Sequence, residues 1–334
     1  MKNYLLTCIA LFIFSTSYSQ APLEEKVTAE SGDVYTDDSQ YGMVLTAPNG
    51  DCYRVRVLND GNLITESINC NGQGPAPCPN SNIDFVNVAG GTFQMGCTPE
   101  QPNCMTLSSL EDENPVHTVT ISSFQMSRYE VTVRQYVEFL NAIGAASDGS
   151  LNGVTIITLT QVSQINFNAG VFSAVVGSEN HPVLAVNWIG ADAFATWACG
   201  RLPTEGEWEF AARGGNSSQG YVYSGSDVVD EVAWYNSNSG GVIHDIGTKM
   251  PNEIGIYDMS GNASEYVFDW WDADYYDVSP VIDPQGPQAA SSGNFRVTRG
   301  GSFNSGTVSG QRVSYRGKQG NIAAGSGTGF RIAK

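Results

Sequence analysis

Alternating apolar and polar positions in residues 41–67 predict a small sheet near the N-terminus. Three short runs, 41–45, 52–58 and 62–67, show this alternation and are separated by the turn signals APNG and NDG. They predict a three-stranded meander within a β-rich segment at 20–70. Residues 71–82 are rich in Gly, Pro and Asn, which interrupt regular structure, and predict a linker. The main domain is expected at 83–334.

Three segments of the main domain show helix-start patterns. Each opens with a side chain that can accept a hydrogen bond from the first turn, and two of them carry Gln or Glu three residues later, which completes a capping box. These positions are Thr132 with Gln135, Asn187, and Thr204 with Glu207. Gly200 and Gly214 are the expected stops of the second and third helices, because glycine favours the backbone conformation that ends a helix. Acidic residues in the third helix's first turn suit the helix dipole, and this favours a structural role for Glu205 and Glu207 over a catalytic one.

Residues 1–19 have the pattern of a secretory signal peptide. Lys2 precedes a roughly ten-residue apolar stretch, and the small residues Ser17 and Ser19 are placed as signal peptidase requires. Almost no apolar stretch precedes Cys8, so cleavage after Ser19 is favoured over a lipoprotein cut at that cysteine. No later window has the roughly 18 apolar residues of a membrane span. We expect an exported protein, secreted, periplasmic or at the cell surface.

The chain is strongly acidic, with 16 Lys and Arg against 34 Asp and Glu and a formal net charge of −18 at pH 7. Nucleic acid and anionic membrane surfaces are therefore unfavourable partners, because both would be repelled. The excess of acid has two interpretations, solubility and cation binding, and acidity alone does not choose between them.

The cysteines that remain after cleavage predict disulfides, because exported thiols meet an oxidising environment. They are Cys52, Cys70, Cys78, Cys97, Cys104 and Cys199. Spacing favours the pairs Cys52 with Cys70 and Cys97 with Cys104, although six cysteines allow about 15 connectivities. Cys199 is the expected free thiol if any remains. A zinc site is the competing interpretation, and the lack of a CxxC pair argues against it.

Several strings of the main domain occur in an order that resembles the formylglycine-generating enzyme (sulfatase-modifying factor) family. They are GGTFQMG, NPVHTVTISSFQMSRYEVTVRQYVEFL, HPVLAVNW, GRLPTEGEWEFAARGG, NEIGIYDMSGNASEYVFDWW, RVTRGGSF and GTGFRIAK. The resemblance covers about residues 83–334. It implies the family's α+β, C-type-lectin-like fold, with little regular secondary structure and many long loops.

The resemblance also implies where the family's chemistry would lie. Members that make formylglycine oxidise a sulfatase cysteine with copper held by two cysteines, five residues apart, just after an RGGS motif. Laid onto Arg299–Ser302, these cysteines fall at about Ser305 and Gly310, and no cysteine follows Cys199. Copper(I) prefers thiolates, which a serine hydroxyl cannot replace. We therefore expect no copper, no catalytic residue at these positions and no formylglycine formation.

Relatives in the sulfoxide-synthase branch use iron bound by histidines of an additional helical domain. The histidines of this chain are His117, His181 and His244, more than 60 residues apart in sequence, and no such domain precedes them. A histidine-iron oxygenase is therefore disfavoured. His117 and His181 match positions that are structural in the resemblance.

A calcium site is the cofactor that the resemblance does carry over. The family binds calcium through a side-chain oxygen at the position of Asp258, through carbonyls at Gly261 and Ala263, and through the carboxylate at Glu265. Oxygen ligands of this kind suit a hard cation. The alternative is a loop in which Asp258 and Glu265 cap neighbouring backbone.

Three functions are compatible with these observations. The first is a non-catalytic binding or envelope and surface-assembly module, the second an enzyme of the family with different chemistry, and the third a lectin-like receptor with ligand-binding C-terminal loops. The expected partner is a protein, a peptide or a glycan. The expected binding surface comprises Phe303, Asn304, Arg312 and Tyr315. Trp270, Trp271, Tyr275 and Tyr276 could stack on a ligand, but a buried cluster with one exposed rim is favoured.

Overall fold

The computed structural model describes residues 82–99, 101, 111–291 and 293–334, together with the backbone of five strands in the preceding part of the chain. The chain divides into two compact units, Met1–Cys78 and Pro79–Lys334. Within the described residues, no helix combines the length and the apolar character that crossing a membrane would require.

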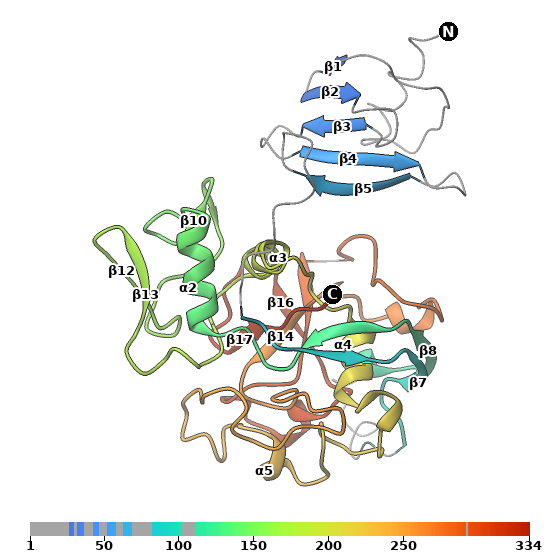
Figure 1. Ribbon diagram of the computed structural model, residues 1–334. Helices are drawn as coiled ribbons and strands as arrows, with labels where there is room; N and C mark the ends of the chain where they lie inside the picture. The colour runs from blue at the N-terminus through green and yellow to red at the C-terminus, as the bar shows by residue number, and fades with distance from the viewer. Residues whose placement is uncertain are drawn as a thin grey trace. The chain divides into compact units, whose positions relative to one another are not determined.

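The first unit contains a five-stranded antiparallel sheet whose strands are neighbours in chain order (Figure 1). Its strands are β1 (Val27–Ala29), β2 (Gly32–Thr36), β3 (Met43–Thr46), β4 (Cys52–Val57) and β5 (Leu63–Ile68). The last three strands confirm the predicted meander. The first two strands were not predicted. β1 has only three residues, too few for alternation to be recognised.

The second unit combines hairpins, a larger sheet and short helices. Strands β16 (Arg316–Gly320), β15 (Phe295–Arg299), β14 (Ser264–Trp270) and β17 (Thr328–Phe330) form a four-stranded sheet in this order. β17 runs parallel to β14, whereas the other neighbours are antiparallel. The two-stranded pairs are β6 (Phe85–Val88) with β9 (Phe124–Ser127), β7 (Gly91–Met95) with β8 (His117–Ile121), β10 (Ser150–Leu151) with β11 (Val154–Thr155), and β12 (Ile165–Asn168) with β13 (Val171–Ala174).

The predicted helices are present with their predicted caps. They are α2 (Val133–Ala142), α3 (Trp188–Trp197) and α4 (Glu205–Ala212). A further helix of one turn, α5 (Val229–Val232), was not predicted. Both capping boxes form, and Asn187 accepts a hydrogen bond from Gly190 N. α3 ends earlier than predicted, because Cys199, before Gly200, adopts the left-handed backbone with φ +55°. The 3-10 turns are η1 (Glu111–Glu113), η2 (Gly215–Ser217), η3 (Tyr275–Asp277) and η4 (Val308–Gln311).

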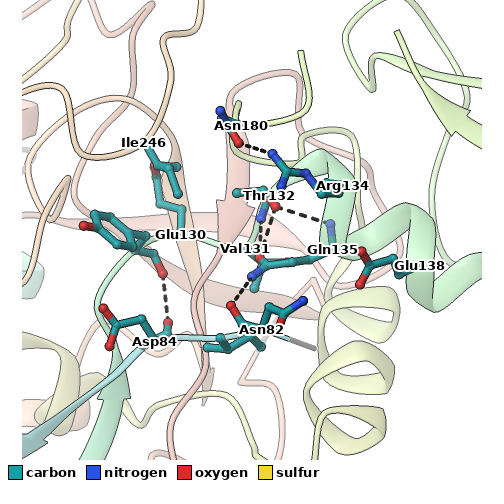
Figure 2. A pocket seen from close by; sticks show the side chains of 13 residues that line it. Asn82, Asp84, Glu130, Val131, Thr132, Arg134, Gln135, Glu138, Asn180 and Ile246 are labelled. Carbon is teal, nitrogen blue, oxygen red and sulfur yellow. Dashed lines mark hydrogen bonds between the residues drawn. The ribbon is translucent and has the colours of Figure 1, made fainter. Parts of the chain in front are cut away.

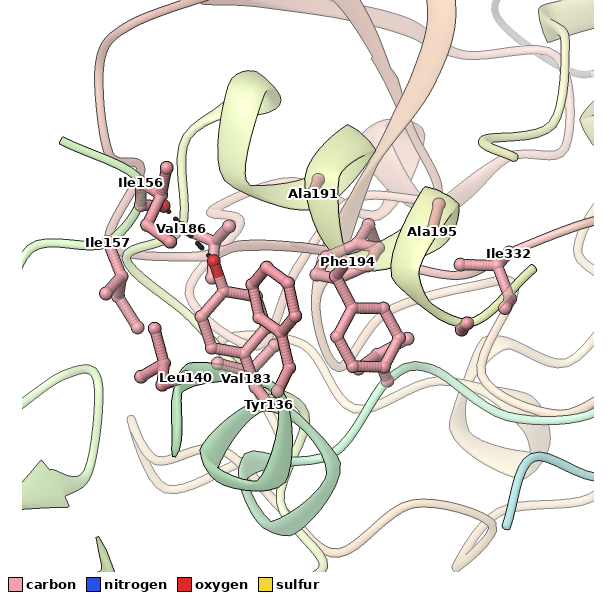
Figure 3. Close-up of a cluster of buried hydrophobic side chains, with 14 of the residues drawn as sticks. Tyr136, Leu140, Ile156, Ile157, Val183, Val186, Ala191, Phe194, Ala195 and Ile332 are labelled. Atoms are coloured by element: carbon pink, nitrogen blue, oxygen red, sulfur yellow. Dashed lines mark hydrogen bonds between the residues drawn. The ribbon is translucent and has the colours of Figure 1, made fainter. Parts of the chain in front are cut away.

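One hydrophobic core joins α2 and α3 to the end of the chain. Tyr136 of α2 stacks on Phe194 of α3 (Figure 3). Both rings also meet Phe330 of β17 edge-on. The Tyr136 hydroxyl donates to the carbonyl of Ile156, so its polar atom is satisfied inside the core. Ile332 is fully buried in the same cluster. Residues near the C-terminal end of the sequence are therefore central to this core.

The second core surrounds α4, whose eight residues are all buried. A helix buried on every side is usually apolar all round, yet this one carries three glutamates. Each is paired with an arginine: Glu205 with Arg316, Glu207 with Arg201, and Glu209 with Arg299 and Arg213. Trp208 and Phe210 provide the apolar packing. The glutamates are thus structural, as the sequence indicated for Glu205 and Glu207.

Candidate functional site

The loop after β15 is held by a buried arginine and two glycines. The guanidinium of Arg299 bonds Glu209 and donates to the carbonyls of Val313 and Ser314, at 2.9 Å each. It thereby joins the strand end to the returning chain. Gly301 has φ +68°, and a Cβ built on it would lie 2.4 Å from the carbonyl oxygen of Gly310. Only glycine fits there, which gives a physical reason for the second glycine of the RGGS string.

The structure brings Ser305 and Gly310 together. A Cβ built on Gly310 would lie 3.9 Å from the Cβ of Ser305. This separation is close to the mean of about 3.8 Å between bonded cysteines, so two thiols at these positions could bond each other or one metal ion. The two positions are therefore adjacent, as cysteine ligands of copper would have to be. In this chain they offer one hydroxyl and no thiol.

Ser302 and Ser305 form a small cluster of hydroxyls in this loop. Ser302 Oγ is 2.8 Å from Asn304 Oδ1 and 3.2 Å from Ser305 Oγ, and Ser302 N donates to Ser305 Oγ at 2.9 Å. A serine nucleophile requires a neighbouring base. In the part of the chain that the structure describes, no histidine is hydrogen-bonded to these serines. The ring nitrogens of His117, His181 and His244 that form bonds contact Pro115, Gln164 and Ser239.

Of the predicted binding surface, three residues reach the surface to different extents. Asn304 is exposed, and Phe303 and Tyr315 are half-buried. Phe303 packs against a small apolar cluster of Leu184, Ile243 and Ala263. Burial raises the pKa of the Tyr315 phenol.

Arg312 does not belong to a surface, and this part of the prediction is wrong. It is 1% exposed. Its two terminal nitrogens donate to the carboxylate of Glu113 at 2.8 and 2.7 Å, and Nη1 also donates to Ser314 Oγ at 2.8 Å. A buried guanidinium needs such a partner. Because Glu113 lies 199 residues away in sequence, no local pattern indicated the pairing.

Asp258 is buried with one carboxylate oxygen that has no hydrogen-bond partner. It is 2% exposed and takes the left-handed backbone, with φ +57°. Its Oδ2 accepts from Gly247 N at 2.7 Å, whereas its Oδ1 is buried and has no hydrogen-bond partner. Burial raises the pKa of Asp258 to about 6. An unpartnered carboxylate oxygen fits a cation ligand.

Glu265 fits calcium less well, because an arginine takes both of its oxygens. Arg331 Nε and Nη2 donate to Oε2 and Oε1 at 2.7 Å each, and Trp208 Nε1 donates to Oε2 at 2.6 Å. Arg331 and Glu265 are both 0% exposed. Among the described residues, no group of three or more His, Cys, Asp or Glu is arranged to hold a metal ion. The predicted set therefore fits calcium in part, through Asp258.

Glu130, which sequence reasoning missed, supports the loop that contains these residues. It is 1% exposed and accepts from Ala263 N at 2.8 Å and from Asn262 Nδ2 at 2.9 Å. Burial, together with the charges of Asp258 and Glu265, holds the pKa of Glu130 well above its ordinary value. Gly261 is also structural, since a Cβ there would lie 2.4 Å from the carbonyl oxygen of Trp234.

Two histidines that are distant in sequence lie near one aspartate. His181 Nε2 is 3.5 Å from Asp245 Oδ1, and His244 adjoins Asp245 in the chain. Burial lowers the pKa of His181. His244 stacks on Trp234, with ring centroids 3.8 Å apart.

The aromatic cluster in 270–276 mainly packs against cations and core. Arg296 lies 3.4 Å from the ring centre of Trp270, and Lys318 Nζ lies 3.6 Å from that of Trp271. Tyr276 is 3% exposed. These contacts favour the structural interpretation over a stacking platform.

The cysteine predictions have a mixed outcome. Cys97 and Cys199 are both disulfide-bonded, so Cys199, the expected free thiol if any remained, is not a free thiol. Spacing along the chain gave no signal for the bond at Cys199. The pairings of Cys52 with Cys70 and of Cys97 with Cys104 stay predictions, because the side chains of Cys52, Cys70 and Cys104 lie outside the described residues.

A cavity of about 240 Å³ lies beside the start of α2 (Figure 2). Arg134 contacts Asn180 Oδ1 on one side, and Asp84, itself paired with Arg128, lies on another. Glu130 also lines the cavity. None of the residues 302–310 lines this cavity.

Residues 73–334 match the sulfatase-modifying factor enzyme 1-like domain family. The chain is 34% identical over 293 residues to a formylglycine-generating enzyme of Thermomonospora curvata, an alignment that covers 75% of this chain and 92% of that enzyme. This chain therefore belongs to the sulfatase-modifying factor family.

Other similarities concern a longer protein and a solved structure. A protein of Chlamydia pneumoniae named serine/threonine-protein kinase pkn1 is 32% identical over 272 residues, which are 81% of this chain but only 41% of that protein. The chain thus spans about two fifths of the length of that relative. The structure of PvdO from Pseudomonas aeruginosa superposes with a TM-score of 0.57 and 24% identity, covering 76% of this chain and 95% of PvdO. This likeness concerns the fold, a mixture of helices and strands.

Proposed function

We propose that this chain is a non-catalytic binding or assembly module of the sulfatase-modifying factor family. One observation carries the proposal. The two positions that would hold copper are adjacent, with 3.9 Å between the Ser305 Cβ and a Cβ built on Gly310, yet they have no thiol. The two positions thus have a spacing that would suit a pair of thiols, and in this chain both lack a thiol. An enzyme of different chemistry is less well supported, because the Ser302 and Ser305 hydroxyls have no base bonded to them among the described residues.

The proposal includes an exported location and a C-type-lectin-like fold. Export is supported by the sequence pattern of residues 1–19. The fold assignment is supported by the long loops between short strands and by the small sheet β16-β15-β14-β17 that carries them. The partner contacts the loop of residues 300–311, with Asn304 exposed at its surface.

The proposal is tested by supplying the missing thiols. The unchanged mature chain and the variant Ser305→Cys/Gly310→Cys are loaded with copper(I) and given oxygen and a sulfatase-type cysteine peptide. We expect the unchanged chain to leave the peptide cysteine intact by mass spectrometry. The double variant should gain copper(I) affinity, measured by competition with a chromophoric chelator, because two soft ligands at this spacing can share one ion.

The single variant Ser305→Cys is the matched control, since it adds one thiol without its partner. It should gain much less copper affinity than the double variant. Formylglycine made by the unchanged chain would refute the non-catalytic assignment. Equal copper affinity of the single and double variants would refute the assigned positions.

A further inference from the structure

The hairpin of β12 and β13 is attached to the rest of the unit through β13, and it lies beside α2 (Figure 1). The side-chain amide of Asn141, on α2, donates to the carbonyl of Phe172 at 3.0 Å and accepts from the N–H of Phe172 at 2.9 Å. This amide occupies the outer edge of β13 as a neighbouring strand would. Among the strands that the structure describes, β12 pairs with β13 alone. The outer edge of β12 is therefore not covered by another strand.

The outer edge of β12 has backbone groups that lack a partner. Val175 N donates to the carbonyl of Gln164 at 2.8 Å, and bonded pairs alternate along an antiparallel ladder. The N–H and C=O groups of Ile165 and Phe167 therefore point away from β13, and within the described residues they form no other hydrogen bond. Ile165 is 6% exposed and Phe167 is half-buried. Backbone groups that are shielded from water normally have a partner, so this edge is incomplete in a single chain.

β12 lacks the features that protect an exposed strand edge from pairing. Such edges usually contain a charged side chain, a proline or a bulge. β16, an edge strand of the four-stranded sheet, has the exposed Lys318. By contrast, the sequence of β12 is INFN, and its register with β13 is regular. Residues 149–178, which include the whole hairpin, contain no Asp, Glu, Lys, Arg or Pro.

A second copy of this chain is the partner that suits this edge. Each copy has a net charge of −18, so two copies repel each other least when they approach through a region without charge. Antiparallel pairing of β12 with its copy about a twofold axis is also self-complementary. With the axis at Asn166, Ile165 of each copy lies opposite Phe167 of the other. The free N–H and C=O groups of both residues then all find partners.

We infer that this protein forms a twofold-symmetric dimer in which the two β12 strands pair and join the hairpins into one four-stranded sheet. Asn166 then lies opposite its own copy, in a pair without backbone bonds, where Cα atoms are about 4.5 Å apart and two amides can bond each other. Because two short strands make the contact, the dimer is weak and depends on concentration. The dimer is independent of the proposed function, since β12 lies outside residues 300–311.

The experiment is sedimentation of the full mature chain at concentrations from about 1 μM to about 0.3 mM. We expect the mass to rise from that of one chain toward that of two. Asn166→Asp and Asn166→Lys should each weaken the dimer about fivefold or more, because like charges then meet at the axis. An equal mixture of the two variants should dimerise more tightly than either variant alone, because opposite charges then meet. Restored pairing in the mixture also shows that both variants are folded.

Ser173→Asp is the matched control, because Ser173 is exposed and lies directly across the hairpin from Asn166, on β13. It adds the same charge to the same face of the hairpin. In the dimer the two Ser173 positions are three strand spacings apart, or about 14 Å. This distance exceeds the Debye length of about 8 Å at 0.15 M salt, so the control should leave the dimer within about twofold of the unchanged chain.

A chain that stays monomeric over the whole range would overturn the inference, as would a dimer that Asn166→Asp leaves unchanged. A mixture of the two charged variants that pairs no better than either alone would overturn the twofold register. Amide exchange at Ile165 and Phe167 that slows when an extended threonine-rich peptide is added, with no change in mass, would replace the second copy by a strand of another protein.

Discussion

Four arginines of the second unit are buried and act inside the protein. Arg299, Arg312, Arg316 and Arg331 are each at most 3% exposed, and each bonds a buried glutamate. Guanidinium groups suit this task because their planar fork matches a carboxylate. They join segments that are far apart in the chain, so each pair fixes one loop against another.

Replacing Arg312 should therefore destabilise the domain, and it should not act by changing a binding surface. Arg312→Ala leaves Glu113 buried without its partner, and we expect a loss of about 3–5 kcal/mol in the free energy of unfolding. Chemical denaturation measures it. Arg134→Ala, which removes an exposed arginine, should cost less than about 1 kcal/mol. Similar losses for both variants would contradict the buried ion pair.

These pairs could not be predicted from the sequence. Arg312 and Glu113 are 199 residues apart, and Arg316 and Glu205 are 111 apart. Arg312 was predicted to lie at the surface because it is close to the RGGS string in sequence, but it is buried. By contrast, Ser305 and Gly310 are five residues apart within one loop, so their adjacency could be inferred from the resemblance.

At the scale of elements, the start of α4 is capped from two sides. Thr204 and Glu207 satisfy each other's backbone N–H groups at its start. Glu205 N donates to Asp269 Oδ2 at 2.8 Å, so an aspartate of β14 caps the same turn. Burial, and next the charge of Glu205, raises the pKa of Asp269 to about 8.

Stability should therefore fall with rising pH because of Asp269. The folded pKa is above the unfolded value of about 3.9, so the folded state binds the proton more tightly. The stabilisation by protonated Asp269 is complete below about pH 4. It is lost as the pH rises to about 8, and the free energy of unfolding falls by up to about 1.4 kcal/mol per pH unit. Asp269→Asn, whose oxygen still accepts from Glu205 N, should flatten this slope in denaturation at several pH values.

Asp274→Asn is the control for this prediction, because Asp274 is exposed. It should leave the slope of stability against pH as it is in the unchanged chain. A slope that is the same in Asp269→Asn would show that the carboxyl is ionised throughout this range.

The helix starts were predictable because capping is local: each cap and its partner are three residues apart. The strand pairs were harder to predict from the sequence. β6 pairs with β9 across the whole β7–β8 hairpin, and β17 joins β14 from more than 50 residues away. Pairings of this kind depend on tertiary packing, which periodicity along the chain does not report.

At the scale of the whole molecule, the negative net charge attracts cations to the protein surface. A net charge of −18 raises the local concentration of Ca²⁺ around the protein. Specific binding still requires a site, and Asp258 is the residue that fits best. Glu265 contributes to stability through Arg331, so its removal destabilises the fold with or without calcium.

Calcium should raise the melting temperature of the mature chain, since a ligand that binds only the folded state stabilises it. Asp258→Ala should abolish this rise, measured by thermal denaturation at increasing calcium concentrations. Asp245→Ala, at an exposed carboxylate, should keep it. Glu265→Ala should lower the melting temperature at every calcium concentration. A full response in Asp258→Ala would place the ion elsewhere.

The position of β17 near the end of the domain determines when the domain can complete its folding during synthesis. Ribosomes deliver the chain from its N-terminus, so residues 328–334 emerge after the rest of the domain. Until then the sheet lacks β17, Glu265 lacks Arg331, and Tyr136 and Phe194 lack Phe330. The nascent domain is thus an unfinished core with exposed apolar surface, which chaperones recognise.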